Sequence, residues 1–175
     1  MKIKILVLSI LFLSVLSACQ SEYAPVGKHS ETATFTEQIS KMEDAGELPE
    51  LERTDTIAGI DTDENGIRDD IDAYIQKNFK NIDQQNAVKQ FAKSMQQFIL
   101  IDPGNRQAAK EASIKNSMAI SCIYLRFSAD TAYKTVNEID AITTNTKKRL
   151  LASNAVDKAL DGTVISEQNG EVCDE

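Results

Sequence analysis

The sequence of 175 residues has no tryptophan, one histidine, three prolines and three cysteines. Basic side chains are also scarce, since 19 Lys and Arg stand against 27 Asp and Glu and the net charge is −8. Proteins that bind nucleic acids need a basic patch to neutralise phosphates, so we predict no nucleic-acid partner. The balance of 42% apolar and 26% charged residues excludes collagen, a long coiled coil and a wholly disordered chain, and is typical of one globular domain.

Common catalytic motifs are missing as well. The sequence contains no G-x-S-x-G, S-x-x-K or H-E-x-x-H pattern. A Ser-His-Asp site would require His29, which stands in a polar segment rich in Ser, Glu, Pro and Gly. We therefore predict that the protein is not an enzyme.

The N-terminus is typical of a secretory signal. Lys2 and Lys4 precede an apolar run, residues 5–16, that is too short to span a bilayer. The residues that follow, Leu16-Ser17-Ala18-Cys19, resemble the lipobox of bacterial lipoproteins. The resemblance implies that residues 1–18 are removed and that Cys19 carries the lipid. Gln20 in the next position implies sorting to the outer membrane, and we expect the protein to face the periplasm.

The mature chain is predicted to be a flexible tether, residues 19–34, followed by a helical domain, residues 35–175. Apolar residues at helical spacing predict helices at 36–45, 68–79, 83–100, 105–127, 132–142 and 150–160. Asp83 is expected to cap the third of them, and the apolar end of the fourth is expected to be buried on all sides. No strand alternation is visible, so the fold class is all-α, a small bundle of five or six helices with an irregular C-terminal tail.

Two cysteines remain once Cys19 is lipidated. In an oxidising cell envelope Cys122 and Cys173 are expected to form a disulfide that ties the tail to a central helix. The alternative is a buried free Cys122 and a loose tail.

One acidic segment has the spacing of a metal site. Residues 61–72 read Asp-Thr-Asp-Glu-Asn-Gly-Ile-Arg-Asp-Asp-Ile-Asp, with short oxygen-bearing side chains at alternate positions and Gly66 at the sixth. Ca²⁺ takes six to eight oxygen ligands, and a tight loop can bring such side chains to one point. The alternative to a metal site is an acidic turn that caps a helix. However, six carboxylates around one Arg repel one another unless a cation is bound.

This segment resembles the calcium loop of EF-hands and dockerins. The resemblance implies a Ca²⁺ site with ligands from six positions: the side chains of Asp61, Asp63, Asn65, Asp69 and Asp72 and the backbone carbonyl of Ile67. The chain departs from the EF-hand at position twelve, where Asp72 replaces Glu, and at position eight, where Arg68 replaces an apolar residue. The preceding segment contains Pro49 and Gly59 and is predicted to be a loop, so the site resembles half of an EF-hand.

Three functions remain open at this point. The first is a lipid-anchored envelope protein that binds another protein or supports an assembly, with calcium in a structural role. The second is an envelope enzyme acting on peptidoglycan or lipid, and the third is a calcium-dependent adhesion module. We favour the first, because immunity lipoproteins, enzyme inhibitors and secretion accessories are built similarly, with a short tether on one small domain.

Overall fold

The computed structural model describes residues 34–166 and 170–174. The predicted signal peptide (1–18), the lipobox with Cys19 and the tether up to residue 33 lie outside these residues. The chain divides between Ile39 and Ser40 into two units. Within the described part of the first unit, Thr34 and Glu37 cap the start of a helix reciprocally, each side chain bonding the other residue's backbone N–H.

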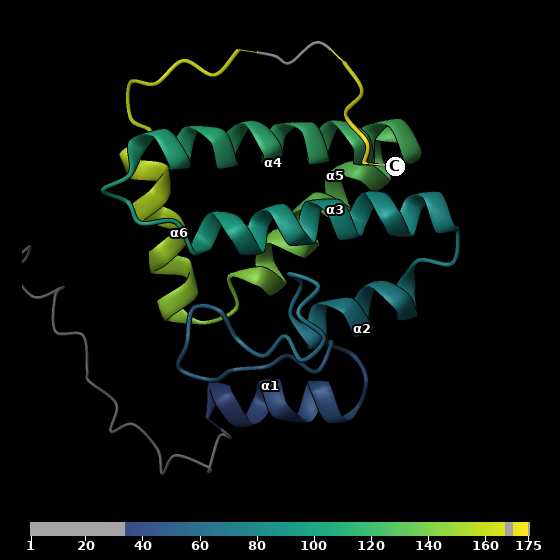
Figure 1. Ribbon diagram of the computed structural model, residues 1–175. Helices are drawn as coiled ribbons and strands as arrows, with labels where there is room; N and C mark the ends of the chain where they lie inside the picture. The colour runs from purple at the N-terminus through teal and green to yellow at the C-terminus, as the bar shows by residue number, and fades with distance from the viewer. Residues whose placement is uncertain (1–33, 167–169, 175) are drawn as a thin grey trace, which may run out of the picture. The chain divides into compact units, whose positions relative to one another are not determined.

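The described residues form six helices and no strand, which confirms the all-α prediction (Figure 1). The helices are α1 (Phe35–Asp44), α2 (Asp69–Asn78), α3 (Ile82–Ile99), α4 (Arg106–Arg126), α5 (Ala129–Thr143) and α6 (Lys147–Ala159). Their bounds lie close to those predicted from the apolar spacing. Asn81 rather than Asp83 caps α3, because its side-chain oxygen accepts the hydrogen bond from the N–H of Gln84.

Helix α3 is the centre of the second unit. It packs against α2, α4, α5 and α6, and in Figure 1 it runs along α4 while α6 lies near the end where α3 stops and α4 begins. The larger core cluster contains fully buried residues of four helices, among them Ile71, Val88, Ile123 and Ile139. A smaller cluster joins the end of α3 to α4 and α6 through Phe98, Ala109 and Val156.

The apolar end of α4 is buried on one face only. Cys122 and Ile123 are buried as predicted, whereas Leu125 is 70% exposed. The prediction of burial on all sides is therefore wrong, because the helices that pack against α4 leave Tyr124, Leu125 and Arg126 exposed.

The C-terminal tail is irregular where it is described and is tied back to the bundle. Cys122 and Cys173 form a disulfide, as predicted, with a Cα–Cα distance of 5.0 Å. The side chain of Gln90 on α3 holds the same end of the tail: its Nε2 donates to the carbonyl of Val172 (2.8 Å) and its Oε1 accepts from the N–H of Asp174 (3.1 Å).

Candidate functional site

The acidic segment forms a tight loop directly before α2. Both carboxylate oxygens of Asp61 accept backbone hydrogen bonds, from the N–H of Asn65 at 3.1 Å and from that of Gly66 at 2.9 Å. Gly66 has a φ of +87°, which is favourable for glycine and strained for other residues. The loop is closed at its base by the N–H of Asp69, which donates to the carbonyl of Ile60.

Asp63 and Asn65 continue this local network. Asp63 accepts from the backbone N–H of Asn65 (3.3 Å) and from its side-chain amide (2.9 Å). The side-chain oxygen of Asn65 accepts in turn from the N–H of Ile67 at 2.8 Å. These bonds orient the two side chains at alternate positions of the loop, as the spacing predicts.

Asp69 approaches the loop from the first turn of α2. Its two carboxylate oxygens accept from Thr62, one from the hydroxyl at 2.6 Å and one from the backbone N–H at 2.9 Å. These hydrogen bonds lower the pKa of Asp69 below its usual range, and the bond from the hydroxyl of Thr62 has the larger effect. The side chain is therefore held ionised and directed towards the loop.

Three of the predicted ligands converge. Asp61, Asp63 and Asp69 each offer a carboxylate oxygen, and these oxygens lie within 4.8 Å of one another. Asn65 is hydrogen-bonded to Asp63 beside them. The donor set consists of oxygen atoms alone, which suits a hard cation such as Ca²⁺ or Mg²⁺.

Asp72 does not belong to this group. Its Oδ1 lies 2.8 Å from the Nζ of Lys89 on α3, and its Oδ2 accepts from the side-chain amide of Gln76 at 2.7 Å. This side chain, in the first turn of α2, is paired with α3. The closing ligand expected at position twelve is thus engaged by a lysine, and the carbonyl of Ile67 stays a prediction.

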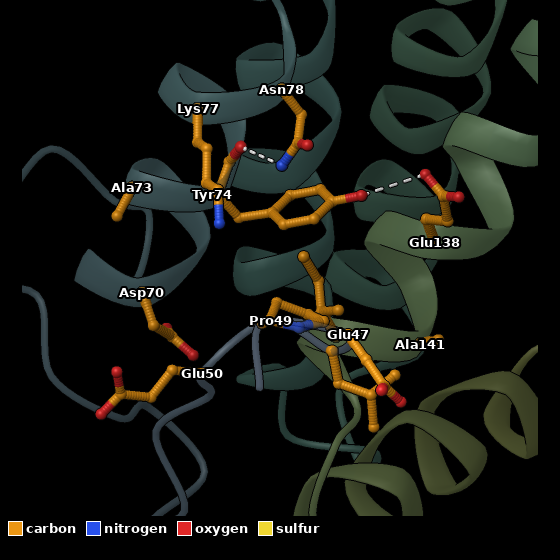
Figure 2. Close-up of a pocket in the computed structure, with 13 residues that line it drawn as sticks. Glu47, Pro49, Glu50, Asp70, Ala73, Tyr74, Lys77, Asn78, Glu138 and Ala141 are labelled. Carbon is orange, nitrogen blue, oxygen red and sulfur yellow. Dashed lines mark hydrogen bonds between the residues drawn. The ribbon is translucent and has the colours of Figure 1, made fainter. Parts of the chain in front are cut away.

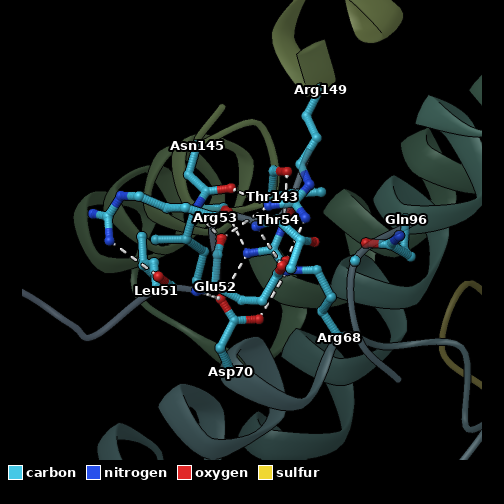
Figure 3. Close-up of polar contacts among 12 residues, drawn as sticks. Leu51, Glu52, Arg53, Thr54, Arg68, Asp70, Gln96, Thr143, Asn145 and Arg149 are labelled. Carbon is cyan, nitrogen blue, oxygen red and sulfur yellow. Dashed lines mark hydrogen bonds and ion pairs between the residues drawn. The ribbon is translucent and has the colours of Figure 1, made fainter. Parts of the chain in front are cut away.

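Arg68, the unusual residue at position eight, is fully buried. Its guanidinium forms a bidentate pair with Asp70, at 2.8 and 2.7 Å, and also donates to the carbonyls of Ile142 and Thr143 at the end of α5. Figure 3 shows this arginine among the polar contacts that join the loop to the later helices. Arg68 therefore anchors the end of the acidic loop to α5 through charge-assisted hydrogen bonds.

Arg149 is a second fully buried arginine in the same network. It forms an ion pair with Glu52 and donates to the side chain of Asn145 (2.7 Å) and to the carbonyl of Glu52 (3.0 Å). The sequence predicts that the run Lys147-Lys148-Arg149 is solvated surface, which is wrong for Arg149. Glu52 lies 97 residues away along the chain, so the local pattern contains no sign of this pairing.

Glu52 stands between the two arginines. Burial raises its pKa, but the hydrogen bonds from Thr54 and the charge of Arg149 outweigh burial, so the pKa is lowered. Gly59 packs against Arg68, and a Cβ there would lie 2.2 Å from the Cδ of Arg68; its φ is +72°. The segment before the acidic loop is therefore shaped closely around the buried guanidinium groups.

A separate cavity of about 620 Å³ lies between residues 46–50, α2 and α5 (Figure 2). The ring of Tyr74 borders it and its hydroxyl donates to Glu138 at 3.1 Å. Burial, the charge of Glu138 and this hydrogen bond together raise the pKa of Tyr74 to about 12. The tyrosine is therefore a neutral donor at physiological pH and not a base.

No protein-family model, curated protein or solved structure matches this chain. None of the helices in the described ranges is both long enough and apolar enough to cross a membrane.

Proposed function

We propose that this chain is a lipid-anchored cell-envelope protein whose helical domain holds a structural Ca²⁺ ion and binds another protein or supports an envelope assembly without catalysis. The single observation that carries the proposal is the convergence of the Asp61, Asp63 and Asp69 carboxylates in a loop with EF-hand spacing. The proposed anchor is the acylated Cys19, since several acyl chains hold a protein at a membrane far more firmly than one.

The position of the loop supports a structural role for the ion. Like-charged oxygens within 4.8 Å of one another are unfavourable without a cation. A bound Ca²⁺ would neutralise them with Asp61, Asp63 and Asp69 as side-chain ligands, and would hold the loop against the start of α2. Extracellular calcium modules work at dissociation constants of about 10⁻⁴–10⁻³ M, which is compatible with three carboxylates and an amide as the donor set.

The predicted partner is a protein. The proposed architecture is one small disulfide-linked helical domain on a short tether. It resembles the architecture of lipoproteins that bind a protein ligand. The disulfide between Cys122 and Cys173 is compatible with a compartment in which thiols are oxidised. The acidic domain would be repelled by anionic lipid, so the acyl chains rather than the protein surface would hold it at the membrane.

Calcium is expected to raise the melting temperature of the domain. At ten times the dissociation constant the ion would stabilise the fold by about 1.4 kcal/mol, which corresponds to a shift of roughly 3–6 °C for a domain of this size. Melting is followed by circular dichroism in calcium and in EDTA, with calorimetry for the heat of binding.

Two loop variants make this test specific. Asp63→Ala should abolish the calcium-dependent shift because it removes a ligand oxygen, whereas Glu64→Ala removes a carboxylate from a residue that is not a predicted ligand and should keep the shift. Identical melting of the wild-type protein in calcium and EDTA, with no heat of calcium binding, would rule out the site.

Lipidation is expected at Cys19. The full-length protein, produced in a Gram-negative bacterium fed an alkyne fatty acid, should be labelled and should sediment with membranes. Cys19→Ala should remove both properties, because the sulfur that carries the diacylglycerol is gone, whereas Cys173→Ser should leave both unchanged. Labelling that persists in Cys19→Ala contradicts the anchor.

A further inference from the structure

A second cavity, of about 330 Å³, lies where α3, α4, α5 and α6 meet. Asp140 of α5 and Asp157 of α6 both line it, and its lining contains no Lys, Arg or His. Two carboxylates of like charge thus share one cavity without a cation from any of the four helices.

These carboxylates have no protein partner. Neither side chain has a hydrogen bond or an ion pair within residues 34–166 and 170–174, and both residues are exposed to solvent. Partial burial, and then the charge of Asp157, raise the pKa of Asp140, and partial burial raises that of Asp157. The nearby charge of Asp157 therefore disfavours the simultaneous ionisation of both carboxyl groups.

Neutral polar groups of the same cavity are also left without partners. Ser153 is only 7% exposed, yet its hydroxyl has no hydrogen bond within the described ranges. The side-chain oxygen of Asn116 is buried and likewise has no partner, while the nitrogen of that amide contacts the sulfur of Met95. A buried acceptor without a donor is unfavourable, so a ligand that brings hydrogen-bond donors would be favoured at this position.

The remaining lining is apolar. Phe91, Met95 and Phe98 contribute from α3, and each is less than a tenth exposed. Methylene groups of a ligand would find contact area there, and aromatic faces attract cations. The cavity thus combines acceptors and negative charge with an apolar wall.

We propose that this cavity binds an organic ammonium ion, a primary alkylamine or diamine with a short methylene chain. An ammonium group has three donors and no acceptor, which matches a lining of carboxylates, a hydroxyl and a carbonyl-type oxygen. The methylene chain matches Phe91, Met95 and Phe98. This site lies apart from the acidic loop and does not depend on the proposed calcium ion.

The test uses putrescine as the probe and 1,4-butanediol as its uncharged counterpart of equal length, measured by calorimetry at pH 7 and low salt. We expect one putrescine per chain and binding at least about tenfold weaker for the diol. Asp157→Asn should weaken putrescine about tenfold or more, while Asp130→Asn, which removes an exposed acid from α5 outside the cavity, should stay within about twofold.

Loss of folding is checked separately. Asp157→Asn removes one of two mutually repelling carboxylates, so its melting temperature should equal or exceed that of the wild type. Because Asp140 and Asp157 are the titratable groups that line the cavity from the four helices, affinity for putrescine should rise with pH through their raised pKa values. Equal binding of the diol, an unchanged affinity in Asp157→Asn, or displacement of putrescine by an equal concentration of calcium would overturn the proposal.

Discussion

Replacing Arg149 with methionine is expected to lower the free energy of unfolding by about 3–5 kcal/mol, the usual cost of removing one partner of a buried ion pair. The guanidinium is 0% exposed, and its loss leaves the Glu52 carboxylate without its closest cation and the side chain of Asn145 without a donor. Urea unfolding followed by circular dichroism measures the change. Methionine keeps the length of the side chain, so the loss of charge and hydrogen bonds dominates over the loss of volume.

The neighbouring lysine provides the control for this variant. Lys148 belongs to the same basic run and to the same turn of α6, but its side chain is 48% exposed and lies 3.6 Å from Asp55, which is 92% exposed. Lys148→Met should therefore change stability by less than about 1 kcal/mol. Comparable losses in the two variants would mean that the buried network contributes nothing beyond surface charge.

Reduction of the disulfide is expected to cost roughly 4 kcal/mol in the chain-entropy account, because the bridge joins residues separated by 51 positions. The comparison is between urea unfolding of the oxidised and the reduced wild-type chain. The same reductant should leave a Cys122→Ser, Cys173→Ser double variant unaffected. An unchanged midpoint after reduction would contradict the expected contribution of the disulfide to stability.

The helices could be predicted because their signal is local. Apolar spacing defined α1 to α5 to within a few residues, and the loop before α2 followed from Gly59, Pro49 and the acidic spacing. Local spacing does not reveal which face of α6 is buried, although Leu150 and Leu151 are its large apolar residues. In the structure these two are 48% and 55% exposed, and Arg149, Ser153 and Val156 face inward instead, because an ion pair to a distant segment orients the helix.

The residues of the candidate sites likewise divide into those that local spacing predicts and those that depend on the packing of distant segments. Asp61, Asp63 and Asp69 were found from their spacing, since a single loop brings them together. The engagement of Asp72 by Lys89 depends on how α2 packs against α3, which no spacing rule contains. The cavity that Asp140 and Asp157 share is formed by four helices, so each of these residues looks like ordinary helix surface in the sequence.

The position of Arg68 has a mechanical consequence. Arg68 directly follows Ile67, and its guanidinium donates hydrogen bonds to the carbonyls of Ile142 and Thr143 at the end of α5. Its ion-pair partner Asp70 accepts a hydrogen bond from the backbone N–H of Glu52. If the acidic loop moves together with Arg68, the hydrogen bonds of Arg68 and Asp70 must break. Otherwise α5 and the segment around Glu52 must move with the loop. Through the side chain of Arg68 the conformation of the acidic loop is therefore coupled to the position of α5 and of the segment around Glu52.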